Sequence, residues 1–187
     1  VRVGATFDTL DSVSFPTTGL RADIEYVSLQ PWGDANVEGD VARISVDWAH
    51  SWERYHLLLG GRVASALDPG VNYQSQTFLG GFLNMSGFAE RALVDRQAAL
   101  ARAVFYRRTG DTSRVFSMPL YIGASVEAGH VWTEWSDFDR SGAILGGSVF
   151  VGFDTPLGPL FLGYGRNNSG ADSWYLTFGS LLRQMQD

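Results

Sequence analysis

Residues 8–19, Asp8-Thr-Leu-Asp-Ser-Val-Ser-Phe-Pro-Thr-Thr-Gly19, decide the fold because of the two segments that they join. Apolar side chains alternate with polar residues or glycine from Val1 to Asp8, and the same alternation runs from Leu20 to Tyr26. A period of two is typical of a β-strand, and two such runs around a turn that contains Pro and Gly predict a hairpin. One face of the second run is charged throughout. That face suits a soluble sheet or a membrane barrel, so the rest of the chain has to decide between them.

The composition excludes several classes of protein. The 187 residues suffice for one domain, and the absence of cysteine excludes disulfides and thiolate metal sites. A net charge of -6 argues against non-specific binding of nucleic acid. No apolar run approaches the roughly 20 residues of a membrane helix. The mean hydropathy of -0.04 agrees with a transmembrane barrel, in which lipid-facing and lumen-facing residues cancel. The chain starts within a strand pattern and shows no signal peptide, which predicts a mature or excised part of a longer protein.

The alternation recurs along the whole chain and predicts an all-β, antiparallel fold. Several of the runs have ten residues or more, which suits tilted strands that cross a bilayer. Helical periodicity is nowhere sustained. The nine predicted strands are 1–8, 19–30, 40–51, 54–66, 96–108, 118–132, 142–154, 159–166 and 173–182.

The predicted connections alternate in length, as periplasmic turns and extracellular loops do in outer-membrane barrels. The short ones are 9–18, Trp52-Glu53 and 155–158, and the longer ones are 31–39, 67–95 and 133–141. The connection 67–95 is unusual for its length and for the apolar, Gly-rich stretch from Phe78 to Phe88. Such a loop needs a surface to bury against, so we expect it to fold inward into a barrel lumen.

Four motifs in a fixed order resemble the C-terminal part of the barrel of the bacterial surface antigen superfamily. That superfamily contains outer-membrane assembly factors and transporters with polypeptide-transport-associated (POTRA) domains. The motif positions are Asp8, Asp11, Phe15, Pro16 and Gly19; Leu79, Gly80, Gly81, Ser86, Gly87 and Phe88; Glu127, Gly129 and Trp132; and Gly158, Pro159 and Tyr164. The resemblance spans essentially all 187 residues. It implies the last nine or so strands of a sixteen-stranded barrel in the outer membrane of a Gram-negative bacterium.

One departure indicates a branch of this superfamily. In the assembly factors the tip of the inward loop carries an Arg that pairs with lumenal acids, whereas Ser86 stands at that position here. The loop, Tyr106-Arg-Arg108 and the stretch Ser125–Trp132 look most like the barrel of patatin-like proteins. Those proteins join an acyl hydrolase, a POTRA domain and the barrel in one chain. The implied partners are outer-membrane lipids, the upstream POTRA and patatin-like domains, the outer-membrane assembly machinery and a possible second copy.

Because successive side chains of a strand point to opposite faces of the sheet, the sequence divides them into two sets. The set expected to face the lumen is Arg21, Asp23, Glu25, Arg43, Asp47, Arg102 and Glu127. The set expected to face lipid is Leu20, Ala22, Ile24, Tyr26, Ile44, Val46, Leu160, Leu162, Leu176 and Phe178. Glu127 is either a partner for a lumenal arginine such as Arg102 or a solvated lumenal charge. Asp8 and Asp11 are expected to hold the turn before Pro16 through local backbone hydrogen bonds.

The chain shows no catalytic or cofactor-binding constellation. A patatin hydrolase needs the elbow Gly-x-Ser-x-Gly, and neither Gly123-Ala-Ser-Val-Glu127 nor Gly146-Gly-Ser-Val-Phe150 ends in glycine. We therefore expect no catalysis by this chain, no cofactor and no metal. The three histidines, at 50, 56 and 130, lack metal-ligand spacing and are expected at the surface or rim. Tryptophans at strand ends predict an interfacial girdle; they are Trp32, Trp48, Trp52, Trp132 and Trp135.

Two other functions are alternatives: a small outer-membrane porin or assembly barrel without a hydrolase, and a soluble ligand-binding barrel. A small channel does not need a long apolar inward loop. A soluble barrel would enclose charges such as Arg21, Asp23 and Glu25 in a dry core, at a cost of several kcal/mol for each unpaired ion. The sequence therefore favours the membrane anchor or translocator of a patatin-like protein.

Overall fold

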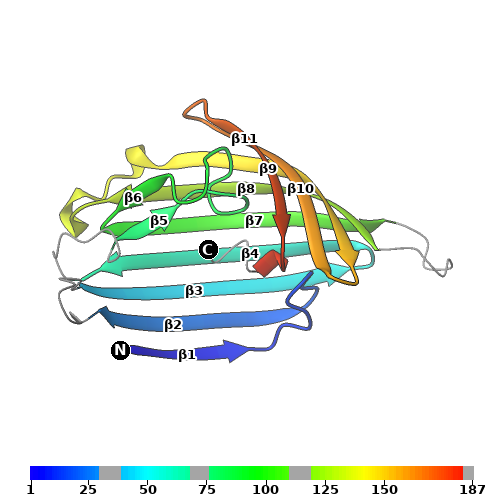
Figure 1. Ribbon diagram of the computed structural model, residues 1–187, viewed down its shortest axis with the longest axis horizontal. Helices are drawn as coiled ribbons and strands as arrows, with labels where there is room; N and C mark the ends of the chain where they lie inside the picture. Colours follow the sequence, from blue (N-terminus) through cyan, green and yellow to red (C-terminus); the bar gives the residue numbers. More distant parts are fainter. Residues whose placement is uncertain (30–38, 68–75, 110–118, 183–187) are drawn as a thin grey trace.

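The computed structural model describes residues 1–29, 39–67, 76–109 and 119–182, and in this part of the chain it is an antiparallel sheet of nine long strands. The sheet has the order β1-β2-β3-β4-β7-β8-β9-β10-β11, so every strand lies beside its neighbour in the chain (Figure 1). The strands are β1 (Arg2–Asp8), β2 (Gly19–Leu29), β3 (Gly39–Trp52), β4 (Tyr55–Ala66), β7 (Gln97–Thr109), β8 (Leu120–Trp132), β9 (Ile144–Thr155), β10 (Gly158–Asn167) and β11 (Asp172–Phe178). The predicted all-β, antiparallel fold is confirmed.

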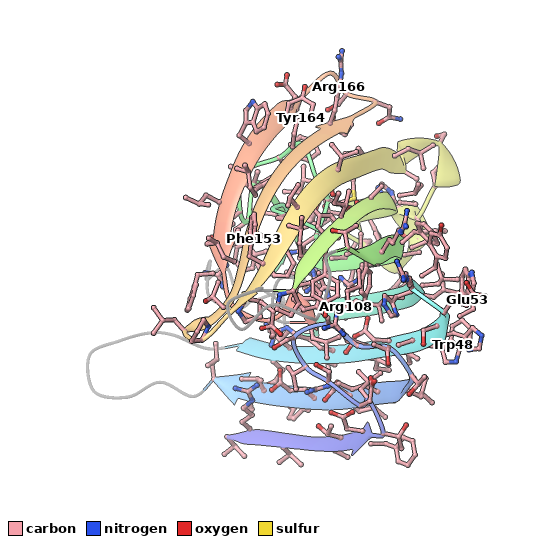
Figure 2. The ribbon with its side chains drawn as sticks, turned by 90° about the vertical axis from the view of Figure 1, so that its right-hand side faces the viewer. Trp48, Glu53, Arg108, Phe153, Tyr164 and Arg166 are labelled. Carbon is pink, nitrogen blue, oxygen red and sulfur yellow. The ribbon has the colours of Figure 1, made fainter. Side chains whose placement is uncertain are left out.

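The sheet is open and curved. Its two edges are β1 and β11, which do not pair with each other. Strands β9 to β11 rise away from the plane of β1 to β3, so that the sheet forms a bent wall around the loop that precedes β7 (Figures 1 and 2). The wall therefore has an inner face, which carries this loop, and an outer face.

Alternation gives each of the nine strands apolar side chains on the outer face, while other apolar side chains, such as Leu58 and Val104, are buried on the inner face. One row of Cα partners runs Phe7, Ala22, Val46, Gly61, Ala101, Ala128 and Leu145 across seven strands. The outer side chains are exposed, as in Ile24 (59%), Ile44 (52%) and Leu176 (73%). Of the residues expected to face lipid, Leu20, Ala22 and Leu160 are partly covered, and the other seven are exposed. An exposed apolar surface of this extent is abnormal for a soluble monomer.

Two predicted strand ends and one predicted connection were wrong. Strand β3 continues to Trp52 and the turn is Glu53-Arg54, where Glu53 takes a left-handed φ of 57°. The last strand ends at Phe178 and not at residue 182, because Gly179 reverses the backbone (φ 131°) and Leu181 and Leu182 fold onto the inner side, where they are buried. The connection 67–95 was expected to lack strands, but it contains the hairpin β5 (Thr77–Leu79) and β6 (Leu93–Asp95).

The remaining connections differ in shape. The link 133–141 holds two single turns of 3₁₀ helix, η2 (Trp135–Asp137) and η3 (Arg140–Gly142). It covers Trp132, which is only 5% exposed and packs against Trp135 and Phe138, so the prediction of an interfacial position for Trp132 was wrong. Trp32 and most of the predicted link 31–39 lie outside the described residues. In the part of the chain that the structure describes, no helix is long and apolar enough to cross a membrane.

Candidate functional site: a loop anchored on the inner face

The loop between β4 and β7 packs against the inner face of the sheet. We call residues 80–92, between β5 and β6, the tip of this loop. The hairpin β5–β6 holds the ends of the tip together, through three Cα pairs from Thr77–Asp95 to Leu79–Leu93. Leu79, at the end of β5, and Phe82, Leu83 and Met85, which follow it, are at most 3% exposed. Burying such side chains contributes roughly 1.5–3 kcal/mol each. This burial explains why so apolar a segment is compatible with a connection between strands.

Glu127 of β8 binds the tip through both carboxylate oxygens. Its Oε2 accepts hydrogen bonds from the backbone N–H of Met85 (2.8 Å) and of Ser86 (2.6 Å). Its Oε1 accepts bonds from the hydroxyls of Ser86 and Ser125, each at 2.7 Å. Both Glu127 and Ser86 are fully buried. Bonds to an ionised acceptor are roughly twice as strong as neutral ones, so this carboxylate is the main polar anchor of the tip.

Strand β11 supplies a second anchor, at the end of the tip. The hydroxyl of Tyr175 accepts a hydrogen bond from the N–H of Gly87 (2.8 Å) and donates one to the carbonyl of Phe88 (2.7 Å). Ser173 donates to the carbonyl of Gly87 (3.2 Å). The tip is therefore bound to strands on both sides of β9 and β10.

The inner face is lined by glycines where the tip approaches. A Cβ atom on Gly165 would lie 2.6 Å from the Cβ of Ser86, and one on Gly163 would lie 2.7 Å from the ring of Phe82. A Cβ on Gly129 would overlap the side chain of Met85. Only glycine permits such close approach of a loop to a strand backbone. The motif position Gly129 thus lies at the contact with the loop.

The tip has a strained backbone that these contacts stabilise. Leu83 and Met85 have φ values of 59° and 79°, in the left-handed region that residues with a side chain rarely adopt. Such residues cost of the order of 1–3 kcal/mol each and persist where the surroundings determine them. Gly80, Gly81 and Gly87 also have positive φ, for which glycine is suited. The motif glycines therefore shape the turn as well as its approach to the sheet.

Charged side chains surround the anchored tip on the inner face. Arg102 pairs with Asp47 at 3.0 Å and donates to the carbonyl of Leu83 at 3.4 Å, and both members of the pair are buried. Glu127 is the Cα partner of Arg102 in the register of β7 and β8. The sequence predicts Glu127 as a lumenal acid, but it does not reveal that the carboxylate binds backbone N–H groups of the loop. No pattern within β8 signals that role.

The other inner-face charges lie over β1 to β4. Arg21 pairs with Asp23 (2.8 Å) and Asp8 (3.3 Å), and Arg43 pairs with Glu25 (3.2 Å). All of these except Asp8 line a polar cavity of about 740 Å³ between the sheet and β5. All seven residues expected to face the lumen thus lie on the face that carries the loop.

The turn 9–18 closes one end of the inner face. Asp8 accepts the N–H of Leu10 (2.9 Å), and Asp11 accepts those of Thr17 (2.8 Å) and Thr18 (3.1 Å), which are the local bonds that the sequence predicts. Partial burial acts to raise the pKa of Asp11, but the hydrogen bond from the Thr17 hydroxyl and these backbone bonds together outweigh it and lower the pKa below its usual range.

The aromatic motif residue of this turn, Phe15, stacks on Tyr121 with ring centroids 3.7 Å apart, while Tyr106 donates a hydrogen bond to the carbonyl of Pro16. The motif residues around the β9–β10 turn lie apart from Phe15. Gly158 takes a φ of 120° in this turn, and Pro159 is buried. Tyr164 lies on the outer face beside Trp174.

The serines of the two incomplete elbow motifs, Ser125 and Ser148, lie within strands. Their hydroxyls share a hydrogen bond of 2.8 Å. His50 is exposed, as expected, but His56 is buried on the inner face beside Tyr106, so its predicted place at the surface or rim was wrong. Among the described residues, no three His, Cys, Asp or Glu side chains are grouped so that they could hold a metal ion.

Of the comparisons with known proteins, the one with solved structures bears on the fold. No protein-family model matches the chain, and no curated protein matches it. Among solved structures, the chain is similar to BamA from Haemophilus ducreyi, in a crystal structure lacking POTRA domains 1–3. The TM-score is 0.75 at 14% sequence identity, and the match covers 94% of this chain but 40% of the BamA chain. The chain thus has the fold of a part of that protein and spans about two fifths of its length.

Proposed function

We propose that this chain is a membrane-spanning part of an outer-membrane β-barrel of the assembly and transport type. The observation that carries the proposal is the division of the sheet into two faces. An exposed apolar face crosses all nine strands, while the charged face carries a buried loop. A transmembrane barrel requires this division, since lipid can solvate the outer face and water the inner one. The structural likeness to BamA supports the same conclusion.

The direction of the strands indicates what closes the barrel. Every adjacent pair is antiparallel, so β1 and β11, as the first and ninth strands, run in the same direction. Pairing them directly would create a parallel ladder, and a second copy inserted in the same orientation would offer the same parallel match. Bacterial single-chain barrels are antiparallel with an even number of strands. A partner with an odd number of strands, such as seven in a sixteen-stranded barrel, would close this wall.

At a finer level we propose the patatin-like branch, with this chain as anchor or translocator of an upstream acyl hydrolase. The support is the stretch Ser125–Trp132 and the loop tip, in which Ser86 binds Glu127 where the assembly factors have an arginine. In this proposal the chain itself is not an enzyme. The alternative is a barrel that assembles or transports outer-membrane proteins without a hydrolase. The likeness to BamA is one of fold, and it is compatible with this alternative as well.

Two experiments test these levels separately. The intact protein should fractionate with the outer membrane and migrate faster on gels before heating than after; recovery in the soluble fraction would contradict the membrane proposal. The purified chain should hydrolyse no ester or phospholipid, whereas the intact protein should hydrolyse phospholipid through a serine outside residues 1–187. Hydrolysis abolished by Ser125→Ala or Ser148→Ala in the chain would contradict the assignment of catalysis elsewhere.

A further inference from the structure

The outer face contains a hollow over β7 to β11. It has a volume of about 710 Å³ and is almost wholly apolar. The outside of a barrel is convex, so side chains of similar size would leave no hollow there. Here Ala124, with the backbone of Gly123 and Gly163, forms a low floor. We call this hollow the outer groove.

Aromatic pairs form the two walls of the outer groove. On one side Phe105 stacks on Tyr55, with ring centroids 5.7 Å apart and planes at 19°. On the other side Tyr164 contacts Trp174, with centroids 5.0 Å apart. Phe105 and Ala124 are direct cross-strand partners, and Val149 follows Ala124 before Tyr164. The groove therefore runs between two aromatic ridges that stand on either side of small residues.

One end of the outer groove carries a positive charge. Arg107, two residues before the end of β7, is exposed and lines the groove. Its guanidinium carbon lies 5.5 Å from the centre of the Tyr55 ring, a cation–π contact that holds the group over the groove. The turn that contains exposed Arg54 adjoins the same strand end, where the N–H of Arg108 bonds to the carbonyl of Arg54 (3.1 Å). An arginine at this position can reach the polar boundary of a membrane while the groove stays in the apolar layer.

We propose that the outer groove binds a phospholipid, with an acyl chain along the floor at Ala124 and the phosphate on Arg107. The proposal rests on the membrane location proposed above. A long apolar groove with one cation at its end is complementary to an amphiphile with an anionic head. The planar guanidinium suits a phosphate, which it can bind through two parallel hydrogen bonds. The aromatic walls hold the acyl chain more closely than a smooth outer face would.

Native mass spectrometry of the intact protein in detergent tests the site, with phosphatidylglycerol and diacylglycerol of the same chains as probes. Arg107→Gln should weaken phosphatidylglycerol binding about tenfold or more, because the Gln amide can keep one hydrogen bond to the phosphate but loses the charge and the second parallel bond; it should leave diacylglycerol binding unchanged. Ala124→Phe should fill the floor and weaken the binding of both lipids. The two variants thus separate recognition of the phosphate from recognition of the chain.

Matched controls lie on the same outer face outside the groove. Arg166→Gln removes an exposed arginine near the opposite end of β10, and Ala22→Phe enlarges a small outer residue of β2. Both should bind the two lipids as the wild type does. Equal loss of phosphatidylglycerol in Arg166→Gln and Arg107→Gln, or undiminished binding in both groove variants, would overturn the proposal. A dimer that Ala124→Phe dissociates would also overturn it, because the groove would then hold a second copy.

The membrane proposal and the lipid site can fail separately. Wild type and controls that fold in the outer membrane, yet bind phosphatidylglycerol no better than the groove variants, would refute only the site. A protein recovered in the soluble fraction would refute the membrane location on which the site depends.

Discussion

At the scale of single residues, Glu127 is the side chain on which the loop most depends. It is buried, and it accepts four hydrogen bonds from the tip and from β8. Alternation along β8 places it on the inner face, but the loop residues that it binds, Met85 and Ser86, are 42 and 41 residues away in the chain. Contacts of that separation depend on the folded path of the loop. They cannot be predicted from alternation along one strand.

Replacing Glu127 by Ala should release the tip, because the N–H groups of Met85 and Ser86 would lose their acceptor in a buried site. We expect a cost of about 2–4 kcal/mol in the free energy of unfolding. Glu127→Gln should cost about half as much, since its amide oxygen can accept both N–H groups and the two serine hydroxyls can turn to accept from its nitrogen. Labelling of a cysteine introduced at Phe82 by a bulky reagent reports release. Equal rates in both variants would contradict the role of the charge.

Gly165→Ala should also displace the tip, because the added Cβ would lie 2.6 Å from that of Ser86. We expect a loss of roughly 1–3 kcal/mol in stability, the usual cost of overpacking. Gly61→Ala is the matched control: it adds the same methyl group to a strand glycine whose nearest atom is 3.9 Å away. Thermal unfolding of the two variants in one detergent provides the measurement. A lower Tm for Gly61→Ala than for Gly165→Ala would refute the close approach.

At the scale of elements, the turn 9–18 is the part for which pH provides a test. The hydrogen bonds of Asp11 lower its pKa in the folded protein, so its contribution to stability is present above the unfolded value of about 3.9 and is lost as the pH falls through the lower folded value. Asp11→Asn should therefore lower the Tm at neutral pH, and the difference from wild type should shrink as the pH falls below about 3.9. Thermal scans across this range measure it. A difference that grows on acidification would show the opposite sign.

The strands were largely predictable from the sequence, whereas the connections were not. Period-two alternation identified nine strands because each carries apolar side chains at alternate positions. The end of β11 was placed wrongly because Leu181 and Leu182 extend the apolar run, yet they pack on the inner face beyond Gly179. The hairpin β5–β6 has only three residues in each strand, too few to show a period.

At the scale of the whole molecule, the outer face determines the solvent that the protein requires. Ile44→Arg, in the middle of β3, should destabilise the protein by about 2–4 kcal/mol in a bilayer, the usual cost of a cation on the lipid side. Arg43→Ala, next to it on the inner face, should be mild, because its pair with Glu25 is partly solvated. Folding titrations into lipid vesicles compare the two. Equal costs would remove the distinction between the faces.

The two-sided character of the wall and the inward position of the apolar loop could both be inferred from the sequence, since each depends on which residues are apolar. The polar anchors, the glycine-lined approach and the outer groove could not. They arise from cross-strand register, which places Ala124 beside Phe105 and Glu127 beside the loop tip only after the sheet has formed. Register is a property of strand pairs, and single-strand patterns do not contain it.

The most direct test of the central claim is a single-cysteine scan along β3, from Val41 to His50, in vesicles that contain the intact protein. This chain has no cysteine of its own to remove. Spin labels at Ile44, Val46 and Trp48 should be accessible to oxygen dissolved in lipid and protected from a water-soluble relaxant. Labels at Arg43, Ser45 and Asp47 should be protected from oxygen. A period of two in this contrast is the predicted result; access of the water-soluble relaxant to both faces would contradict a membrane-spanning wall.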